Sequence, residues 1–562
     1  MESGARRPTP RVLSAAFAAL VVAWTAGCGG EGASDAADLV LVGGVEPSAV
    51  GVSDGRIVYV GDDAGARALI GPATEVVELD GRKVLPGFHD THVHPLSGGL
   101  ELADCDLAPA ETRADVARLV SACAAASPTA PWVLGGGFQL PLFPAGAPPK
   151  ELLDSLVPDR PAYLTSADAH TAWVNSRALE LAGIGASTPD PLPDGVIVRA
   201  GDGSPQGTLR ESAMSLVERH LPERSTEELR AGLARGLAMA ASFGITTLHE
   251  ASADSTFLAA YAEAEREGSL TARVIVALRV DPAGGTEQVA ELAALRDRYA
   301  GRLVRPVAAK IFLDGVIEGG TAALLEPYVD RPGWRGELNV PPDTLAALVA
   351  ELDSAGFKVH VHAIGDRAIR AALDALELQH RRDGGAGPRH ILAHIQLFDP
   401  QDVQRMAELG VVASFQPLWA YADSYVTELT EPRLGPARSR WLYPIRSVIE
   451  SGAIVAAGSD WSVTSMNPLL AIEAAVRRVD PALDEGAPWI PEERVALGQI
   501  LVAYTLGGAL AADLEQETGS IEVGKSADLV VLERDPYAVE ARELSDVRVD
   551  LTVLEGRIVY RR

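Results

Sequence analysis

The sequence predicts an α/β protein, a (β/α)8 TIM barrel that carries a small β-sandwich domain built from both chain ends. Eight short apolar runs alternate with longer helical stretches in the middle of the chain, as in repeated βα units. The two ends instead share short β-runs broken by Gly and Asp. We therefore expect the barrel over residues 86–510, and the sandwich over 38–85 and 511–562.

The first 28 residues have the pattern of an export signal. Three arginines precede a mostly apolar run from Val12 to Trp24, which is too short to span a bilayer as a permanent helix. The small residues before Cys28 resemble a bacterial lipoprotein cleavage site, at which the cysteine is lipidated. This predicts an exported protein, lipid-anchored on the periplasmic or extracellular side of a bacterial membrane, with residues 29–37 as a tether. Plain secretion and a retained cytoplasmic tail are the alternatives.

The β-runs of the two chain ends resemble each other closely. The stretch 556–560 repeats 55–59 as Gly-Arg-Ile-Val-Tyr. A β-unit shared between the two ends indicates that both fold together into one sheet domain, with the middle of the chain as a large insertion. Coincidence between common β-residues is the alternative.

The middle of the chain offers the eight strands that a (β/α)8 barrel needs. Most are rich in Val, Ile, Leu or Ala, as expected for strands buried on both faces. The candidate strands are 84–92, 244–249, 273–280, 307–313, 357–362, 390–394, 411–415 and 453–459. The long gap between the first two predicts an insertion at about 98–240, which would form a wall or lid of the pocket.

Composition excludes some partners. The formal charge of −28 disfavours binding to phosphate backbones, so we expect no nucleic acid partner. No other apolar stretch is long enough to cross a membrane, so membrane contact is expected only through the lipid anchor. Cys105 and Cys123 either pair in an oxidising compartment or remain two partly buried thiols.

Histidines and one aspartate follow or end several of the predicted strands. His92 and His94 have the i, i+2 spacing that puts both rings on one face of a strand, which suits a divalent metal. His362, His394 and Asp460 close three later strands. Because barrel geometry brings the carboxyl ends of the strands into one ring, these side chains are expected to meet there.

Lys310 lies within an apolar strand, in a chain that has only five lysines. Burial disfavours its charged form and leaves a nucleophilic amine. Such an amine can take up carbon dioxide as a carbamate, whose oxygens could bridge two metals. The alternative is a lysine bonded to a nearby carboxylate such as Asp314.

As an ordered set, these motifs resemble the amidohydrolase superfamily and, within it, the amidohydrolase-3 family, which includes N-substituted formamide deformylases. The matching segments are 86–94, 310–315, 362–368, 393–396 and 458–461. The resemblance implies metal ligands at His92, His94, Lys310 (as carbamate), His362 and His394. It also implies that Asp460 contacts the metal-bound water, and it supports the split β-sandwich. His360 is an extra candidate; we prefer His362 because Ala-Ile-Gly-Asp follows it.

The ligand set predicts a metal-dependent hydrolase. A divalent metal, with one or two zinc ions as the leading expectation, would activate water, and Asp460 would act as general base and then acid. The expected reaction is cleavage of a carbon–nitrogen bond in a non-peptide amide, N-acyl or N-formyl compound. Alternatives are an esterase or other carbonyl hydrolase using the same site, and a non-catalytic lipid-anchored binding protein.

Further polar residues are candidates for the pocket. We expect His170, Trp173 and His249 to bind substrate, although packing or capping would explain them equally well. Asp90 and Asp314 are expected to orient metal-binding histidines. The expected partners are a small-molecule substrate and a second copy of the chain in a homodimer.

Overall fold

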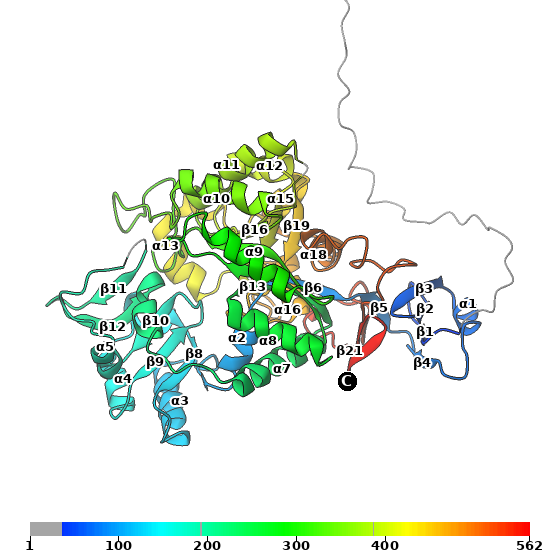
Figure 1. The fold of residues 1–562 in the computed structure, drawn as a ribbon, viewed down its shortest axis with the longest axis horizontal. Coiled ribbons are helices and arrows are strands. Elements are labelled where there is room, and N and C mark those ends of the chain that lie inside the picture. The colour runs from blue at the N-terminus through cyan, green and yellow to red at the C-terminus, as the bar shows by residue number, and fades with distance from the viewer. Residues whose placement is uncertain (1–35, 192–193, 386) are drawn as a thin grey trace, which may run out of the picture.

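The computed structural model describes residues 36–191, 194–385 and 387–562 (Figure 1). The export signal, Cys28 and most of the predicted tether lie outside the described residues. Within the described ranges, no helix has both the length and the apolar character needed to cross a bilayer.

The predicted barrel is confirmed as an eight-stranded parallel sheet in which each strand pairs with the next along the chain. Its strands are β6 (Phe88–Val93), β13 (Ile245–Ala253), β14 (Arg273–Arg279), β15 (Val304–Phe312), β16 (Lys358–Ala363), β17 (Ile391–His394), β18 (Val412–Phe415) and β19 (Ile454–Ala457). After β19, the backbone amide of Asp460 donates to the carbonyl of His92 at 2.7 Å. This bond links the last strand of the sheet to the first.

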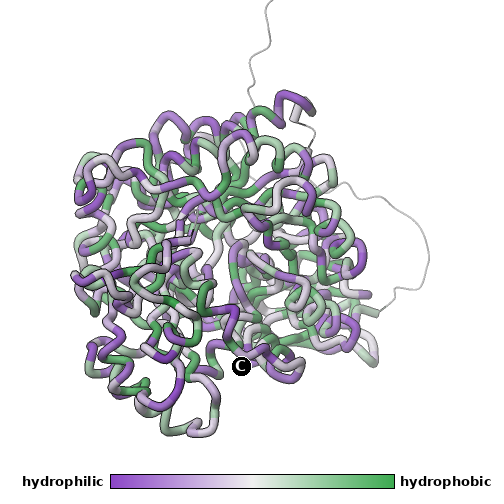
Figure 2. The backbone as a smooth tube through the Cα atoms, turned by 60° about the vertical axis from the view of Figure 1, so that its left-hand side comes forward, coloured by the Kyte–Doolittle hydropathy of each residue, from purple (hydrophilic) through white to green (hydrophobic). Residues whose placement is uncertain are grey.

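Helices cover the sheet on the outside, and hydrophobic stretches gather toward the centre of the molecule (Figures 1 and 2). The longer helices around the barrel are α2 (Pro95–Glu101), α7 (Thr226–Ser242), α8 (Ser255–Arg266), α9 (Gln288–Tyr299), α10 (Pro342–Ser354), α11 (Asp366–Asp383), α12 (Pro400–Glu408), α15 (Ile445–Glu450), α16 (Pro468–Arg477), α17 (Leu497–Ala503) and α18 (Leu506–Ala511). Side chains cap some of these helices: α7 begins with a capping box between Ser225 and Glu228, and Asp254 caps α8. A loop with a π-helix (Tyr425–Thr430), α13 (Glu431–Leu434) and α14 (Pro436–Ser439) follows β18.

The first predicted strand, 84–92, is in fact two strands that belong to different sheets. β5 (Lys83–Pro86) pairs antiparallel with β20 (Leu529–Leu532), whereas β6 belongs to the barrel. The chain passes between them at Gly87, whose amide donates to Asp528 of the sandwich, while the next amide donates to Gly244 of the barrel. Proline followed by glycine interrupts the ladder, so one apolar run serves both domains.

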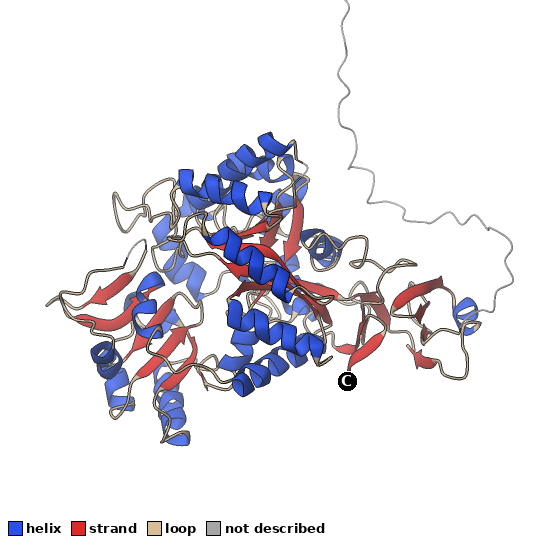
Figure 3. Cartoon of the chain, in the orientation of Figure 1, coloured by secondary structure: helices blue, strands red, loops and turns tan. Residues whose placement is uncertain are grey.

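Both chain ends build the β-sandwich, as the repeat predicts: strands from the blue N-terminal and red C-terminal parts lie together in Figure 1, and Figure 3 shows that this part is mostly strands. The remaining strands are β1 (Leu39–Val42), β2 (Ala49–Ser53), β3 (Arg56–Gly61), β4 (Glu75–Glu78), β21 (Val549–Leu554) and β22 (Arg557–Arg561). The sheet orders β3-β2-β1-β4 and β22-β21-β20-β5 place the two copies of the repeat on equivalent edge strands. Leu39 and Val52 share one apolar cluster with Leu529 and Val553, so the two sheets have a common core.

The long insertion folds as a second, mixed sheet at the end of the molecule opposite the sandwich (Figure 1). Its elements are β7 (Cys105–Asp106), α3 (Arg113–Ala126), β8 (Val133–Phe138), α4 (Lys150–Leu156), β9 (Ala162–Ser166), β10 (Thr171–Val174), α5 (Ser176–Leu181), β11 (Val196–Arg199), β12 (Pro205–Arg210) and α6 (Ser215–Glu218). Cys105 and Cys123 form a disulfide that ties β7 to α3. At the end of the predicted insertion, α7 packs against α2 and β13 of the barrel.

Candidate metal centre

The carboxyl ends of the barrel strands bring the predicted ligands together. Register places Lys310 beside His360, Phe312 beside His362, and Ala363 beside His394. These positions lie at the end of the barrel where catalytic groups of such folds are found.

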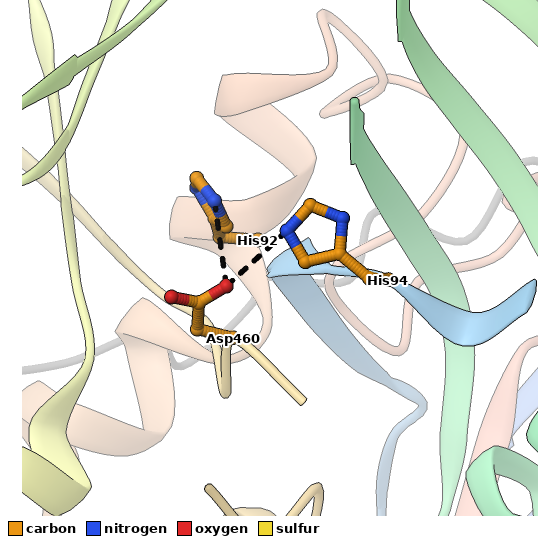
Figure 4. Close-up of side chains that lie close together, drawn as sticks. All are labelled: His92, His94 and Asp460. Carbon is orange, nitrogen blue, oxygen red and sulfur yellow. Dashed lines mark ion pairs between the residues drawn. The ribbon is translucent and has the colours of Figure 1, made fainter. Parts of the chain in front are cut away.

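His92, His94 and Asp460 form the tightest group of metal-binding side chains (Figure 4). One ligand atom from each lies within 4.8 Å of the others. Asp460 Oδ1 lies 3.3 Å from His94 Nε2 and 3.7 Å from His92 Nε2. Two imidazole nitrogens and a carboxylate oxygen that converge in this way are a donor set that fits a divalent cation.

His362 and His394 extend this group across the barrel end. The ring centroids of His92 and His394 are 4.4 Å apart, and those of His394 and His362 are 4.5 Å apart. Asp460 Oδ2 lies 3.8 Å from His394 Nδ1, so this carboxylate stands between the first and the later histidines. Burial lowers the pKa of His92, His362 and His394, which favours the neutral rings that bind metals.

Lys310 lies beneath these rings and is wholly buried. Its Nζ is 3.1 Å from His92 Nε2 and 4.7 Å from the centre of the Phe312 ring. Burial lowers the pKa of Lys310 to about 7. Asp314 is not its partner, because the Asp314 carboxylate accepts hydrogen bonds from the backbone amides of Ala323, Ile364 and Gly365.

Two residues without a role in the sequence-based ligand set orient the histidines. His94 Nδ1 donates to Glu250 at 3.3 Å, and Glu250 also accepts from the Tyr261 hydroxyl at 2.6 Å. His394 Nδ1 donates to Gln416 Oε1 at 3.0 Å. Gln416 directly follows β18, and Glu250, inside β13, directly follows the predicted strand 244–249; these positions are the only signal that the sequence offers for the two residues.

Two carboxylates give the position of His94 a marked preference for positive charge. Burial alone would lower the pKa of His94. Its hydrogen bonds to Asp460 and Glu250, together with their charges, outweigh burial and raise that pKa to about 9. An arrangement that stabilises a proton here also attracts a cation.

His360 is close to the group but takes a different place. Its Nε2 lies 2.9 Å from His92 Nδ1, on the side of the ring away from Asp460, and burial lowers the pKa of His360. The contact orients His92, whereas His362 lies two residues further along the strand, closer to the carboxyl end of the barrel.

Asp90 and Asp314, the expected orienting carboxylates, mainly hold the backbone. Asp90 accepts from the amide and hydroxyl of Ser459, at 2.9 and 2.5 Å, and so ties the end of β19 to β6. Asp314, in the loop after β15, accepts hydrogen bonds from two backbone amides just beyond β16 and so joins these segments. Its carboxylate also lies 3.8 Å from His362 Nε2. Burial raises the pKa of each carboxyl to about 7.

A cavity of about 240 Å³ opens beside the metal-binding side chains. His362, His394 and Asp460 line it, and so does His170 from the insertion. His170 Nδ1 donates to Glu211 at 2.7 Å, and Glu211 accepts from the Thr321 hydroxyl at 2.5 Å. Glu211 therefore occupies Nδ1 of His170, and within the described residues Nε2 forms no hydrogen bond.

Trp173 and His249 do not line this cavity. Trp173 is fully buried in the apolar core of the insertion, and its indole donates to the carbonyl of Pro149. His249 is buried inside the barrel against His89. The strand alternation sends the neighbouring Glu250, rather than His249, to the metal-binding histidines. For both residues, packing is the role that the structure supports.

Comparisons with known proteins agree with this geometry. A model described as the amidohydrolase family matches residues 75–560. N-substituted formamide deformylase from Arthrobacter pascens is 30% identical over 92% of this chain and 95% of its own. Protein LONG AFTER FAR-RED 3 from Arabidopsis thaliana is 31% identical, over 91% of this chain and 88% of its own.

Solved structures extend the similarity to three dimensions. The crystal structure of an uncharacterized metal-dependent hydrolase from Pyrococcus furiosus superposes with a TM-score of 0.68. It is 26% identical, and the match covers 89% of this chain and 99% of that one. The similarity therefore extends over the barrel together with the added domains.

Proposed function

The chain belongs to the amidohydrolase family, and we propose that this protein hydrolyses a carbon–nitrogen bond in a small non-peptide amide, such as an N-acyl or N-formyl compound. The observation that carries the proposal is the place of Asp460, which lies between His92 and His94 and also faces the cavity. A relative of similar length is named for cleavage of N-substituted formamides, which supports this bond class.

The residues that would hold the metal follow from the geometry. His92, His94 and Asp460 would hold one divalent cation, with His362 and His394 as ligands of a second. The nitrogen and oxygen donors favour zinc, although manganese, iron, cobalt or nickel would fit the same set. When bound, such a metal lowers the pKa of water toward about 7 and polarises the scissile carbonyl.

Asp460 would move the proton that hydrolysis requires. Its carboxylate accepts one proton from the attacking water as the water oxygen bonds to the carbonyl carbon. The carbon–nitrogen bond then breaks, and Asp460 returns that proton to the leaving nitrogen. One amide and one water thus become one carboxylic acid and one amine, and Asp460 ends in its starting state.

His170 would bind the substrate from the opposite wall of the cavity. Glu211 accepts from Nδ1 and holds the ring in place, so Nε2 is the atom that meets the substrate. A ring fixed by a buried carboxylate needs no reorganisation when the substrate arrives, which is the condition for effective positioning.

Lys310 would bridge the two metals after it reacts with carbon dioxide. The amine forms one nitrogen–carbon bond and loses one proton, which leaves a carbamate with two oxygen donors. Three observations support this: full burial, the 3.1 Å approach to His92, and the lack of any carboxylate hydrogen bond to Nζ among the described residues. These conditions keep the amine neutral and nucleophilic.

The function is tested with purified, metal-loaded protein on matched amides and esters. Asp460→Asn is expected to lower kcat by about 10²-fold or more, since general acid–base catalysis contributes about 10²–10⁴-fold. Metal content, measured by elemental analysis, should fall as well if Asp460 is a ligand. Asp546→Asn, an exposed carboxylate in the C-terminal part, is the control. Full turnover by the Asp460→Asn variant would contradict the role of Asp460 as general base. A preference for esters over amides would show that the enzyme cleaves a carbon–oxygen bond instead.

The carbamate is tested separately. Lys310→Ala is expected to lose one of two bound metals and most of the activity, because the bridging oxygens are gone. A short carboxylate such as propionate should restore part of both by supplying oxygen donors. If the variant retains two metals and full activity without any added carboxylate, Lys310 does not bridge the metals.

A further inference from the structure

The wall of the cavity beyond the metal-binding side chains is acidic and aromatic. Three carboxylates, Asp168, Glu318 and Asp423, line it in addition to Asp460. The aromatic residues of the lining are Trp419, Tyr421, Tyr425 and Tyr443. These lining residues all belong to the described part of the chain, and they include no lysine or arginine.

Within the described residues, no lysine or arginine donates a hydrogen bond to any of these three carboxylates. Arg210, whose charge acts on Asp168, donates instead to the backbone carbonyls of Ala145 and Gly319. Glu318 Oε1 accepts from the Gln396 amide at 3.0 Å and from the Thr430 hydroxyl. Asp423 accepts from the backbone amide of Val426 at 2.8 Å. Among the residues that the structure describes, neither acid accepts a hydrogen bond from a charged side chain. The donors that hold them are neutral, so the negative charge remains directed at the cavity.

Asp168 adds an oxygen that has no partner. Its Oδ1 accepts from the Ser166 hydroxyl and from the amide of His170 at 3.3 Å. Its Oδ2 is buried and, within the described chain, has no hydrogen bond. A buried carboxylate oxygen without a donor is costly, which indicates that a ligand supplies the donor. The charge of His170 also acts on Asp168, but Nδ1 of His170 is already bonded to Glu211.

The aromatic rings connect the metal-binding side chains to the acidic wall. Trp419 stacks on His394 with parallel planes and a centroid distance of 5.6 Å. Tyr443 meets Trp419 edge to face at 6.5 Å. Burial and the charge of Glu318 raise the pKa of Tyr443, so its ring stays neutral. Ring faces of this kind attract organic cations, and more strongly where water is excluded.

We propose that the cavity selects a substrate whose scissile amide lies at Asp460 and whose far end carries an ammonium or another organic cation. Glu318, Asp423 and Asp168 bind the cationic end, and the aromatic residues enclose its carbon chain. This inference rests on the proposed function, because it names the class of amide that the same centre cleaves: acylated or formylated diamines and related basic compounds.

Three formamides of matched length test the selectivity. N-formylputrescine carries an ammonium, N-formylpentylamine a methyl group at the same position, and N-formylaminovalerate a carboxylate. The kcat/KM for the cationic formamide should exceed that for the neutral one by about tenfold or more, because one charge-assisted hydrogen bond contributes about that factor. The anionic formamide should have the lowest kcat/KM of the three. Equal kcat/KM for the cationic and neutral compounds overturns the inference and leaves the proposed function intact.

Variants assign the selectivity to the acidic wall. Glu318→Gln and Asp423→Asn should each lower the cationic-to-neutral ratio of kcat/KM by about tenfold. Glu180→Gln, an exposed acid on α5, should leave the ratio unchanged. An unchanged ratio in both cavity variants overturns the inference. So does a fall in the number of bound metals per chain, which would show that these acids hold a metal instead.

Binding separates this inference from the proposed function. Pentylamine, an ammonium ion at neutral pH, and the uncharged 1-pentanol are titrated into the metal-loaded protein by calorimetry. If no amide is cleaved but pentylamine binds about tenfold more tightly than 1-pentanol, and the Glu318→Gln, Asp423→Asn double variant removes the difference, the cation site stands although the proposed function fails. Equal affinities for the two compounds overturn the cation site.

Discussion

At the scale of single residues, the geometry of the centre depends on side chains that do not face the cavity. Glu250 receives the Nδ1 proton of His94 and is held in turn by Tyr261 and by the amide of Ser252. Gln416 likewise accepts the Nδ1 proton of His394. A histidine whose second nitrogen is bonded in this way has its tautomer and ring orientation chosen before a metal arrives.

Glu250→Gln is therefore expected to weaken metal binding about 10–100-fold, because the neutral amide removes the charge that favours a cation at His94. The affinity is measured by competition with a chromophoric chelator. Glu180→Gln is again the exposed control. An unchanged affinity would show that His94 does not depend on Glu250 for its place in the centre.

At the scale of elements, the centre requires that the last barrel strand is held to the first. Asp90, on β6, accepts both the amide and the hydroxyl of Ser459 after β19, and the amide of Asp460 donates to His92. Asp314 joins the loop after β15 to the end of β16 in the same manner. Buried carboxylates thus position the loops that border the candidate metal centre.

Asp90→Ala should lower the free energy of unfolding by at least about 1–3 kcal/mol, because two buried donors of Ser459 lose their acceptor. Denaturant unfolding followed by circular dichroism measures the change. The exposed Asp546→Ala should stay within about 0.5 kcal/mol of the unmodified protein. Equal stability of the two variants would mean that Ser459 finds other acceptors and that the strand closure does not need Asp90.

At the scale of the whole molecule, a buried ion pair joins the barrel to the sandwich. Arg273 at the start of β14 donates to Asp528 beside β20 at 2.7 Å, and both side chains are almost fully buried. Asp528 also accepts from the amide of Glu555. The pair therefore crosses the boundary between the two domains.

Asp528→Ala should destabilise the protein by about 3–5 kcal/mol, since the charge of Arg273 remains buried after its main partner is gone. Because Glu555 lies 3.3 Å from Arg273 and remains as a partner, we expect a loss of stability toward the lower end of that range. Arg302→Ala removes only an exposed pair with Glu555 and should cost less than about 1 kcal/mol. A small loss at Asp528 in thermal or denaturant unfolding would contradict the role of the pair.

The sequence alone determined the barrel and the shared sandwich. It also predicted His92, His94, His362, His394 and Asp460 near strand ends and Lys310 within a strand, because each of these signals is local to a short apolar run. Three features depended on the tertiary structure. They are the division of 84–92 between two sheets, the burial of Trp173 in the core of the insertion, and the contact of His94 with Glu250 rather than His249. The acidic wall depended on it too, since Asp168, Glu318 and Asp423 come from three separate loops. No periodicity links such residues, and only the packing of the insertion and the loops on the barrel brings them into one cavity.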